Sequence, residues 1–259
     1  MNFTKSSNPI FGKKAFDRAY ADSSAEVMTI EGAMNKSAVL LLLVVVSAAY
    51  VWSKFSGAYN PAFPAEATSA VAPYMLIGGI GGFIIAMITS FSPRRAGVLA
   101  PVYALMEGMF LGGISAIIEA KFGGQGLVSR AVGLTFGVFV LMLFLYRSKT
   151  IRVTGKFRMG IMAATGGIAL IYFISWIASM FGANMGFMYG SSTIGIGFSL
   201  FVVAIAALNL ILDFDFIDRA AAARAPKYME WYAAFGLMVT LVWLYLEILK
   251  LLARFASRD

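Results

Sequence analysis

The segment Leu208–Asp218, with the sequence LNLILDFDFID, ends a long apolar run and places three aspartates within its last six residues. A second apolar run, Trp231–Leu252, follows after a short polar loop. A carboxylate beside hydrocarbon is costly unless it has a partner or a function. An aspartate at a helix C-terminus also meets the negative end of the helix dipole. The rest of the chain should therefore supply the groups that surround and balance these carboxylates.

The composition of the chain is that of an integral membrane protein. Its 259 residues are 60% hydrophobic and 13% charged, with a mean hydropathy of +0.80, whereas soluble domains are only about 45–50% apolar. Cysteine and histidine are both absent. Their absence excludes disulfides, thiol catalysis, zinc or haem centres held by histidine, and the Ser–His and HExxH intramembrane proteases. Any pH response must therefore come from carboxylates.

Seven apolar runs are each long enough to cross about 30 Å of hydrocarbon at about 1.5 Å per residue. Lipid offers no partners for backbone polar groups, so each run should be a helix. We expect an all-α integral membrane domain of seven transmembrane helices over residues 35–259, after a solvated N-terminal tail over residues 1–34. The runs are Ser37–Ser53, Ala72–Phe91, Ala96–Ile118, Leu127–Tyr146, Gly160–Phe181, Thr193–Phe214 and Trp231–Leu252.

The distribution of lysine and arginine predicts the orientation of the chain. An N-terminus on the cytoplasmic side puts fifteen of the 21 basic residues on that side and six on the other, as the positive-inside rule requires. The net charge of +8 is then explained by orientation in a lipid bilayer, without a nucleic-acid partner. Three of the six outer basic residues, Lys250, Arg254 and Arg258, lie at the C-terminal end of the chain, so a last segment that re-enters or fails to cross is the alternative.

Small residues recur at four-residue spacing in the second and third runs, which predicts close contact between helix backbones rather than a pore lining. The two sets are Gly78, Gly82 and Ala86, and Gly108, Gly112 and Ala116.

Glu107 is the deepest ionisable residue, about eleven residues and so roughly 16 Å into the third run. A carboxyl group near the bilayer midplane must face the protein interior or water. Two interpretations stay open, namely a neutral group hydrogen-bonded to a neighbouring helix and a member of an ion pathway.

We expect the aspartates of LNLILDFDFID to lie on the same side of the membrane as Arg94 and Arg95, because the sixth run crosses from the outer to the cytoplasmic side. An ion pair between Asp213 and one of these arginines is therefore plausible. We expect Asp215 and Asp218 to be loop residues beyond the end of the helix.

Two further acidic residues have a basic neighbour one helical turn away. Asp215 can pair with Arg219 at i, i+4, and Glu247 with Lys250 at i, i+3, which are the spacings that bring side chains together on a helix. We favour these local pairs over a functional role for either carboxylate.

Several long motifs resemble the bacterial branch of the Bax inhibitor-1/YccA family. Besides LNLILDFDFID, they are MTIEGAMNKSA (28–38), APVYALMEGMFLGGISA (100–116), IRVTGKFRMGIMAATGGIAL (151–170) and WYAAFGLMVTLVWLYLEILK (231–250). The resemblance extends over nearly the whole chain from about Ser7. It implies a seven-helix fold with the last helix central, residence in the bacterial inner membrane and a proton-sensitive calcium leak. In some bacterial members it also implies association with the membrane protease FtsH.

The resemblance also implies roles for single residues. The family's sixth-helix aspartate matches Asp213, and its arginine between the second and third helices matches Arg94 or Arg95. The family's second aspartate, in the last helix, is replaced by Thr240 when counted back from Lys250. A carboxylate pair that shares one proton is therefore missing from this chain.

We accordingly expect a proton-sensitive cation leak in which calcium is the transported ion and no cofactor is bound. Asp213 held by an arginine would close the bundle, and protonation of Asp213 would release it, so the leak would rise as the pH falls. The alternative is a non-conducting protein that modulates a membrane protease or quality-control complex. An enzyme is not expected, because the GxGD motif of aspartyl intramembrane proteases is absent. A retinal protein is not expected either, because the lysine of the last run, Lys250, lies at its end instead of midway along it. The sequence leaves open the oligomeric state, any metal site and whether four residues serve a pathway or the structure: Glu107, Asp215, Thr240 and Glu247.

Overall fold

The computed structural model describes residues 26–182 and 192–257. Within them, seven helices are long and apolar enough to cross a membrane, so the expected all-helical fold is confirmed. The first 25 residues of the expected tail lie outside the described residues. The helix α2 already begins at Ile30, within the range 1–34 that the sequence suggested for the tail. The helices are α2 (Ile30–Ala58), α3 (Pro64–Phe91), α4 (Ala96–Lys121), α5 (Leu127–Arg147), α6 (Gly155–Met180), α8 (Thr193–Ala222) and α9 (Met229–Ala256), with a 3-10 turn η2 (Pro93–Arg95).

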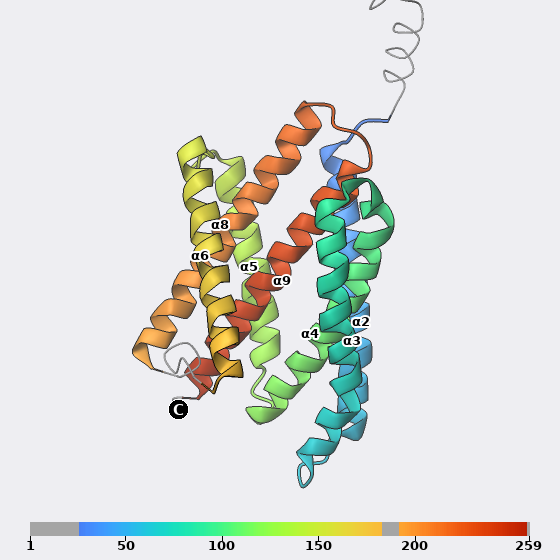
Figure 1. The fold of residues 1–259 in the computed structure, drawn as a ribbon, viewed down its shortest axis with the longest axis vertical. Coiled ribbons are helices and arrows are strands. Elements are labelled where there is room, and N and C mark those ends of the chain that lie inside the picture. Colours follow the sequence, from blue (N-terminus) through green and yellow to red (C-terminus); the bar gives the residue numbers. More distant parts are fainter. Residues whose placement is uncertain (1–25, 183–191, 258–259) are drawn as a thin grey trace, which may run out of the picture.

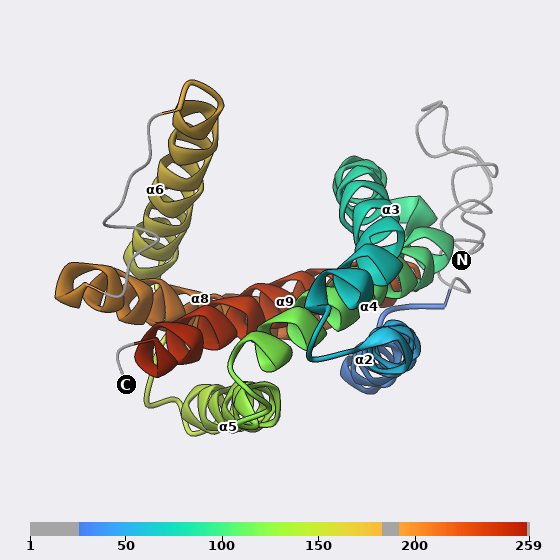
Figure 2. The same cartoon turned by 90° about the horizontal axis from the view of Figure 1, so that it is seen from below.

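The last helix, α9, lies at the centre of the bundle, as the resemblance implied. Figure 1 shows α9 crossing between the other helices. Seen along the bundle in Figure 2, α8, α9 and α4 form one row, with α2 and α5 on one side and α3 and α6 on the other. Helix α9 contacts α2, α4, α5 and α8, which explains why its residues are the most buried of all the spans.

Hydroxyl side chains explain where three of the helices begin. Thr29, Thr154 and Ser192 precede α2, α6 and α8, and each side chain accepts a hydrogen bond from the backbone N–H three residues further on. Such N-caps satisfy one of the four N–H groups that the first turn of a helix leaves without a partner. The helix starts are therefore encoded locally.

Helix α8 is longer than expected, because it continues through the aspartates to Ala222. Our prediction that Asp215 and Asp218 are loop residues is therefore wrong. Both carboxylates have partners: Asp215 forms an ion pair with Arg158, and Asp218 accepts a hydrogen bond from Tyr146. These partners offset the unfavourable interaction with the helix dipole, and the alanines that follow are good helix formers.

The small-residue stripes bring helices together, as predicted. A Cβ atom added to Gly108 would lie 2.4 Å from the carbonyl oxygen of Val44, and one added to Gly112 would lie 2.3 Å from that of Ala48. A Cβ atom on Gly78 would lie 2.5 Å from the carbonyl oxygen of Met106. These distances leave no room for a side chain, so α4 can pack directly on α2 and on α3.

Gly112→Ala is expected to destabilise the protein by roughly 1–3 kcal/mol, because the new methyl group forces α2 and α4 apart. Gly133→Ala on α5 is the matched control, since nothing lies within 4 Å of a Cβ atom there. Thermal unfolding of both variants in detergent measures the difference. An equal effect of the two substitutions would contradict the packing role of Gly112.

Seven spans among the described residues predict that the start of α2 and the end of α9 lie on opposite sides of the membrane. Ser148 follows the fourth span and Ser257 follows the seventh. Single cysteines at these positions of the cysteine-free chain should therefore react with an impermeant thiol reagent from opposite sides, Ser148→Cys from the cytoplasm. Labelling of both from one side would show that α9 does not cross.

Candidate functional site

Asp213 lies on α8, which packs against α9. Two of its neighbours in the sequence, Ile211 and Phe214, are buried. The Thr240 side chain of α9 lies beside the Asp213 carboxyl group. The carboxyl oxygen Oδ2 is buried and finds no hydrogen-bond partner among the described residues. The structure therefore brings together Asp213 and Thr240, the two positions that the resemblance assigns to the family's aspartate pair.

The arginines Arg94 and Arg95 are exposed, on the turn between α3 and α4. Among the ion pairs of the described residues, neither arginine contacts Asp213. The expected latch between an arginine and Asp213 is therefore not formed in this structure.

The turn that carries Arg94 and Arg95 lies at a different level of α9 from Asp213, which explains why no contact forms. The C-terminal end of α3 lies at the first turn of α9, where the Tyr232 hydroxyl donates to the Ser90 carbonyl over 3.3 Å. Thr240, which marks the level of Asp213, is eight residues further along, about 12 Å at 1.5 Å per residue. A latch would need one of these segments to shift along the other.

Asp215 takes part in a three-residue ion-pair cluster. Its carboxylate lies 2.8 Å from Arg158 and 2.9 Å from Arg219. The local pair with Arg219 is confirmed. Arg158 was missed because it comes from α6, and no spacing within one helix points to it.

Glu247 is buried, with 2% of its side chain exposed, and lies 2.5 Å from the Lys250 ammonium, which confirms this local pair. The Tyr172 hydroxyl of α6 lies 3.1 Å from both carboxylate oxygens. The Lys250 ammonium also lies 4.9 Å from the centre of the Tyr172 ring. Glu247 therefore joins α9 to α6 near the end of the bundle opposite the N-terminal side.

Glu107 lies on α4 and is half-buried. A Cβ atom added to Gly82 of α3 would lie 3.1 Å from the Glu107 oxygen Oε2. The side chain thus lies at the contact between α3 and α4. It belongs to a different part of the bundle from the Asp213–Thr240 pair, which lies between α8 and α9.

Glu230 is a buried carboxylate that sequence reasoning missed. Its side chain is 0% exposed. It accepts hydrogen bonds from the Thr29 N–H at 2.9 Å and the Thr29 hydroxyl at 3.0 Å. It also forms ion pairs with Lys36 and, at 3.3 Å, with Lys227. The only sequence signals were a lysine three residues before it and the conspicuous motif MTIEGAMNKSA, which contains Thr29 and Lys36.

The segment before α2 contacts the loop between α8 and α9 at the N-terminal side of the bundle. The Met28 N–H donates to the Ala225 carbonyl over 2.7 Å, and the Lys227 N–H donates to the Glu26 carbonyl over 3.1 Å. The segment before α2 is therefore held against the loop between α8 and α9. We call this arrangement, comprising Thr29, Lys36, Lys227 and Glu230, the Glu230 cluster.

In the described part of the chain, no group of three or more acidic side chains could hold a metal ion. Acidic residues are present, but they are distributed between separate helix contacts. The described residues therefore offer single carboxylates such as Asp213 and no multidentate metal site.

Comparison with known proteins gives the family. Neither the curated proteins nor the solved structures contain a match to this chain. The family model described as Bax inhibitor 1 like matches residues 8–257, which is nearly the whole chain. The described residues form seven helices that are long and apolar enough to cross a membrane, and the protein belongs to the Bax inhibitor 1 like family of multi-pass helical membrane proteins.

Proposed function

We propose that the protein is a proton-sensitive cation leak of the bacterial inner membrane, with calcium as the transported ion and Asp213 as the group that takes up the proton. The observation that carries this proposal is the buried Asp213 carboxyl group, whose Oδ2 atom has no hydrogen-bond partner among the described residues. A carboxyl group left incompletely satisfied within a membrane-spanning helix is typical of proton and ion pathways.

Thr240 lies beside this carboxyl group, but its hydroxyl is placed to donate to the Gly236 carbonyl over 3.3 Å. A hydroxyl has a single proton to donate. While it donates to Gly236, it leaves the Asp213 carboxylate incompletely satisfied.

The ionised form of Asp213 would instead need a positive partner. No lysine or arginine among the described ion pairs supplies one. A cation that enters between α8 and α9 would neutralise the carboxylate, so protons and cations would compete for the same group. Acidification would then lower the flux, which is the opposite of the response expected from an arginine latch.

Calcium flux into liposomes that contain the purified protein tests this function. We expect flux above that of protein-free liposomes, with a dependence on pH. Flux equal to that of protein-free liposomes at every pH would exclude the leak.

A second candidate is a non-conducting interaction protein that modulates a membrane protease of the FtsH type or another quality-control complex. It is favoured by the carboxylates Asp215, Asp218, Glu230 and Glu247, which all have partners within the protein. This candidate predicts no flux in liposomes but a change in the activity of a copurifying membrane protease. Neither candidate is an enzyme, and neither requires a bound cofactor.

The proposed orientation has the N-terminus in the cytoplasm, because the basic residues of the chain gather on that side. The Glu230 cluster and the turn with Arg94 and Arg95 would then face the cytoplasm. A cytoplasmic partner would meet these groups first.

A further inference from the structure

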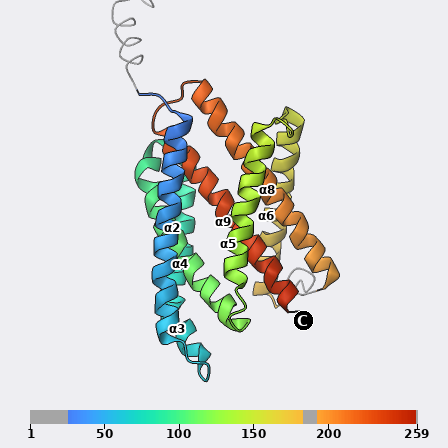
Figure 3. The same cartoon turned by 180° about the vertical axis from the view of Figure 1, so that it is seen from behind.

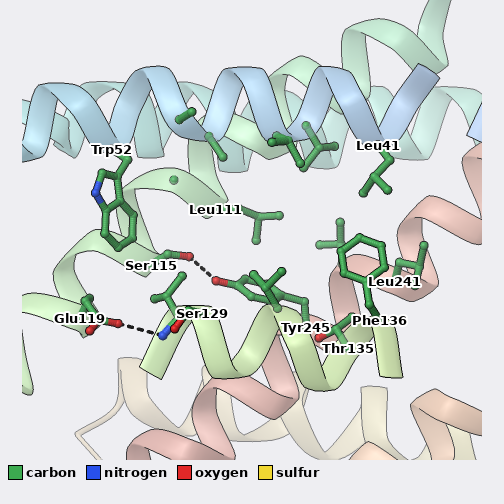
Figure 4. Close-up of a pocket in the computed structure, with 18 of the residues that line it drawn as sticks. Leu41, Trp52, Leu111, Ser115, Glu119, Ser129, Thr135, Phe136, Leu241 and Tyr245 are labelled. Atoms are coloured by element: carbon green, nitrogen blue, oxygen red, sulfur yellow. Dashed lines mark hydrogen bonds between the residues drawn. The ribbon is translucent and has the colours of Figure 1, made fainter. Parts of the chain in front are cut away.

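A cavity of about 690 Å³ lies between α2 and α5, above a floor of α4 and α9. Figure 4 shows α2 along one edge and α5 along the other, with Trp52 at one end and Leu41 near the opposite end. A second cavity of about 270 Å³ shares Leu41, Phe136 and Leu241 with the first. The two cavities are therefore neighbours between α2 and α5, and we call them together the α2–α5 groove.

The α2–α5 groove extends along most of the bundle. Its first cavity reaches Trp52 and Glu119 near one end of the helices, and its second reaches Ile30 and Arg147 at the N-terminal side. Figure 3 shows α2 and α5 running on either side of α9, with this helix between them. The groove is thus parallel to the spans and opens sideways, toward the place where lipid chains surround the protein.

The middle of the groove is apolar, and its polar side chains are already engaged. Ser115 and Tyr245 hydrogen-bond to each other over 2.7 Å. The Glu119 carboxylate accepts the Val128 N–H over 2.8 Å at the start of α5. The groove therefore offers an elongated hydrophobic surface with few free polar groups, which suits a hydrocarbon chain.

The size of the groove suits a small ligand. The larger cavity, at about 690 Å³, falls in the range of about 300–1,000 Å³ that is usual for small ligands. An acyl chain matches both the volume and the elongated shape.

The N-terminal side of the groove supplies positive charge. Arg147 lines the second cavity and begins a segment, residues 147–158, that holds five basic and no acidic residues. Of these, Arg158 is engaged by Asp215, whereas Arg147 forms no ion pair among the described residues. Asp218 also lines this cavity, but its carboxylate accepts the Tyr146 hydroxyl.

We infer that the α2–α5 groove binds an anionic phospholipid, with an acyl chain along the groove and the headgroup phosphate at Arg147. Basic pockets between spans at the membrane surface bind such headgroups. The lipid would contact α9 through Leu241, one residue after Thr240, and would fill the space that α2 and α5 leave between them. This site does not depend on whether the protein conducts ions.

Native mass spectrometry of the detergent-solubilised protein tests the acyl-chain part of the site. The probes are phosphatidylglycerol and phosphatidylcholine with identical acyl chains. Val45 lines the groove and Val46 does not, although their exposed fractions, 55% and 58%, are nearly equal. Val45→Trp should fill the groove and abolish retention of phosphatidylglycerol, whereas Val46→Trp should retain it as the parent does. Equal retention by both variants, or equal loss, would overturn the proposal.

A matched pair of variants, Arg147→Gln and Arg152→Gln, tests the headgroup part of the site. Arg147→Gln should lower the affinity for phosphatidylglycerol about five-fold and leave that for phosphatidylcholine unchanged. Arg152→Gln, an exposed position of the same basic segment outside the groove, should have a smaller effect. Equal effects of the two variants would indicate attraction by the whole segment and would overturn the assignment of Arg147. A photo-crosslinker in place of Val45 should give a lipid adduct, and a protein adduct would contradict a lipid occupant.

Discussion

Asp213→Asn is expected to abolish the pH dependence of calcium flux in liposomes. A single titrating carboxyl group changes its occupancy by at most about tenfold per pH unit, and asparagine cannot titrate. The amide can still hydrogen-bond to Thr240, so the contact between α8 and α9 should survive. Flux through the variant, measured between acidic and mildly basic pH, should therefore stay level where the parent changes.

Asp218→Asn is the matched control, because Asp218 lies on the same helix and its carboxylate is engaged by Tyr146. This variant should keep the pH dependence of the parent. If Asp213→Asn also kept it, Asp213 would not be the proton site. The non-conducting interaction protein would become the better account if the parent itself showed no flux.

The direction of the parent's response distinguishes two mechanisms. Competition between protons and cations at Asp213 predicts that flux falls on acidification. A latch that Asp213 forms with Arg94 or Arg95 in another conformation predicts that flux rises on acidification. In the second case Arg94→Gln or Arg95→Gln should reproduce the open state at every pH.

Glu230→Ala is expected to destabilise the protein by about 3–5 kcal/mol, the usual cost of removing one partner from a buried ion pair. The substitution leaves the Lys36 and Lys227 ammonium groups without their carboxylate. It also removes the acceptor for the Thr29 N–H. The connection between the segment before α2 and the start of α9 should weaken, and thermal unfolding in detergent should occur at a lower temperature.

Glu26→Ala provides the comparison for Glu230→Ala. Glu26 also faces Lys227, at 3.9 Å, but its side chain is 80% exposed, and exposed pairs contribute about 0–1 kcal/mol. Glu230→Gln should give an intermediate loss, because the amide keeps an acceptor for Thr29 but not the charge. Similar stabilities for the Glu230→Ala and Glu26→Ala variants would show that the Glu230 cluster does not hold the bundle together.

The sequence by itself determined the number of spans and the approximate position of each, although α2 and α3 begin seven and eight residues before the runs Ser37–Ser53 and Ala72–Phe91. Hydrocarbon forces each apolar run to satisfy its own backbone, so hydropathy translates directly into helices. Ion pairs within one helix could also be predicted from the sequence, because i, i+3 and i, i+4 neighbours lie on the same face of a helix. Asp215–Arg219 and Glu247–Lys250 both form. The small-residue stripes of α3 and α4 likewise predicted close contacts between helices. The central position of α9 came from the family resemblance rather than from hydropathy.

Only the tertiary structure decided which groups meet across helices. It placed Thr240 beside Asp213 and kept Arg94 and Arg95 away, and it continued α8 past the aspartates because partners came from α5 and α6. Glu230 and Thr29, which are 201 residues apart, meet at one end of the bundle. Such contacts depend on the crossing points and the axial register of helices, which similar apolar surfaces encode only weakly. The α2–α5 groove has the same origin, since it exists only where two helices pack on α9 and leave a space between them.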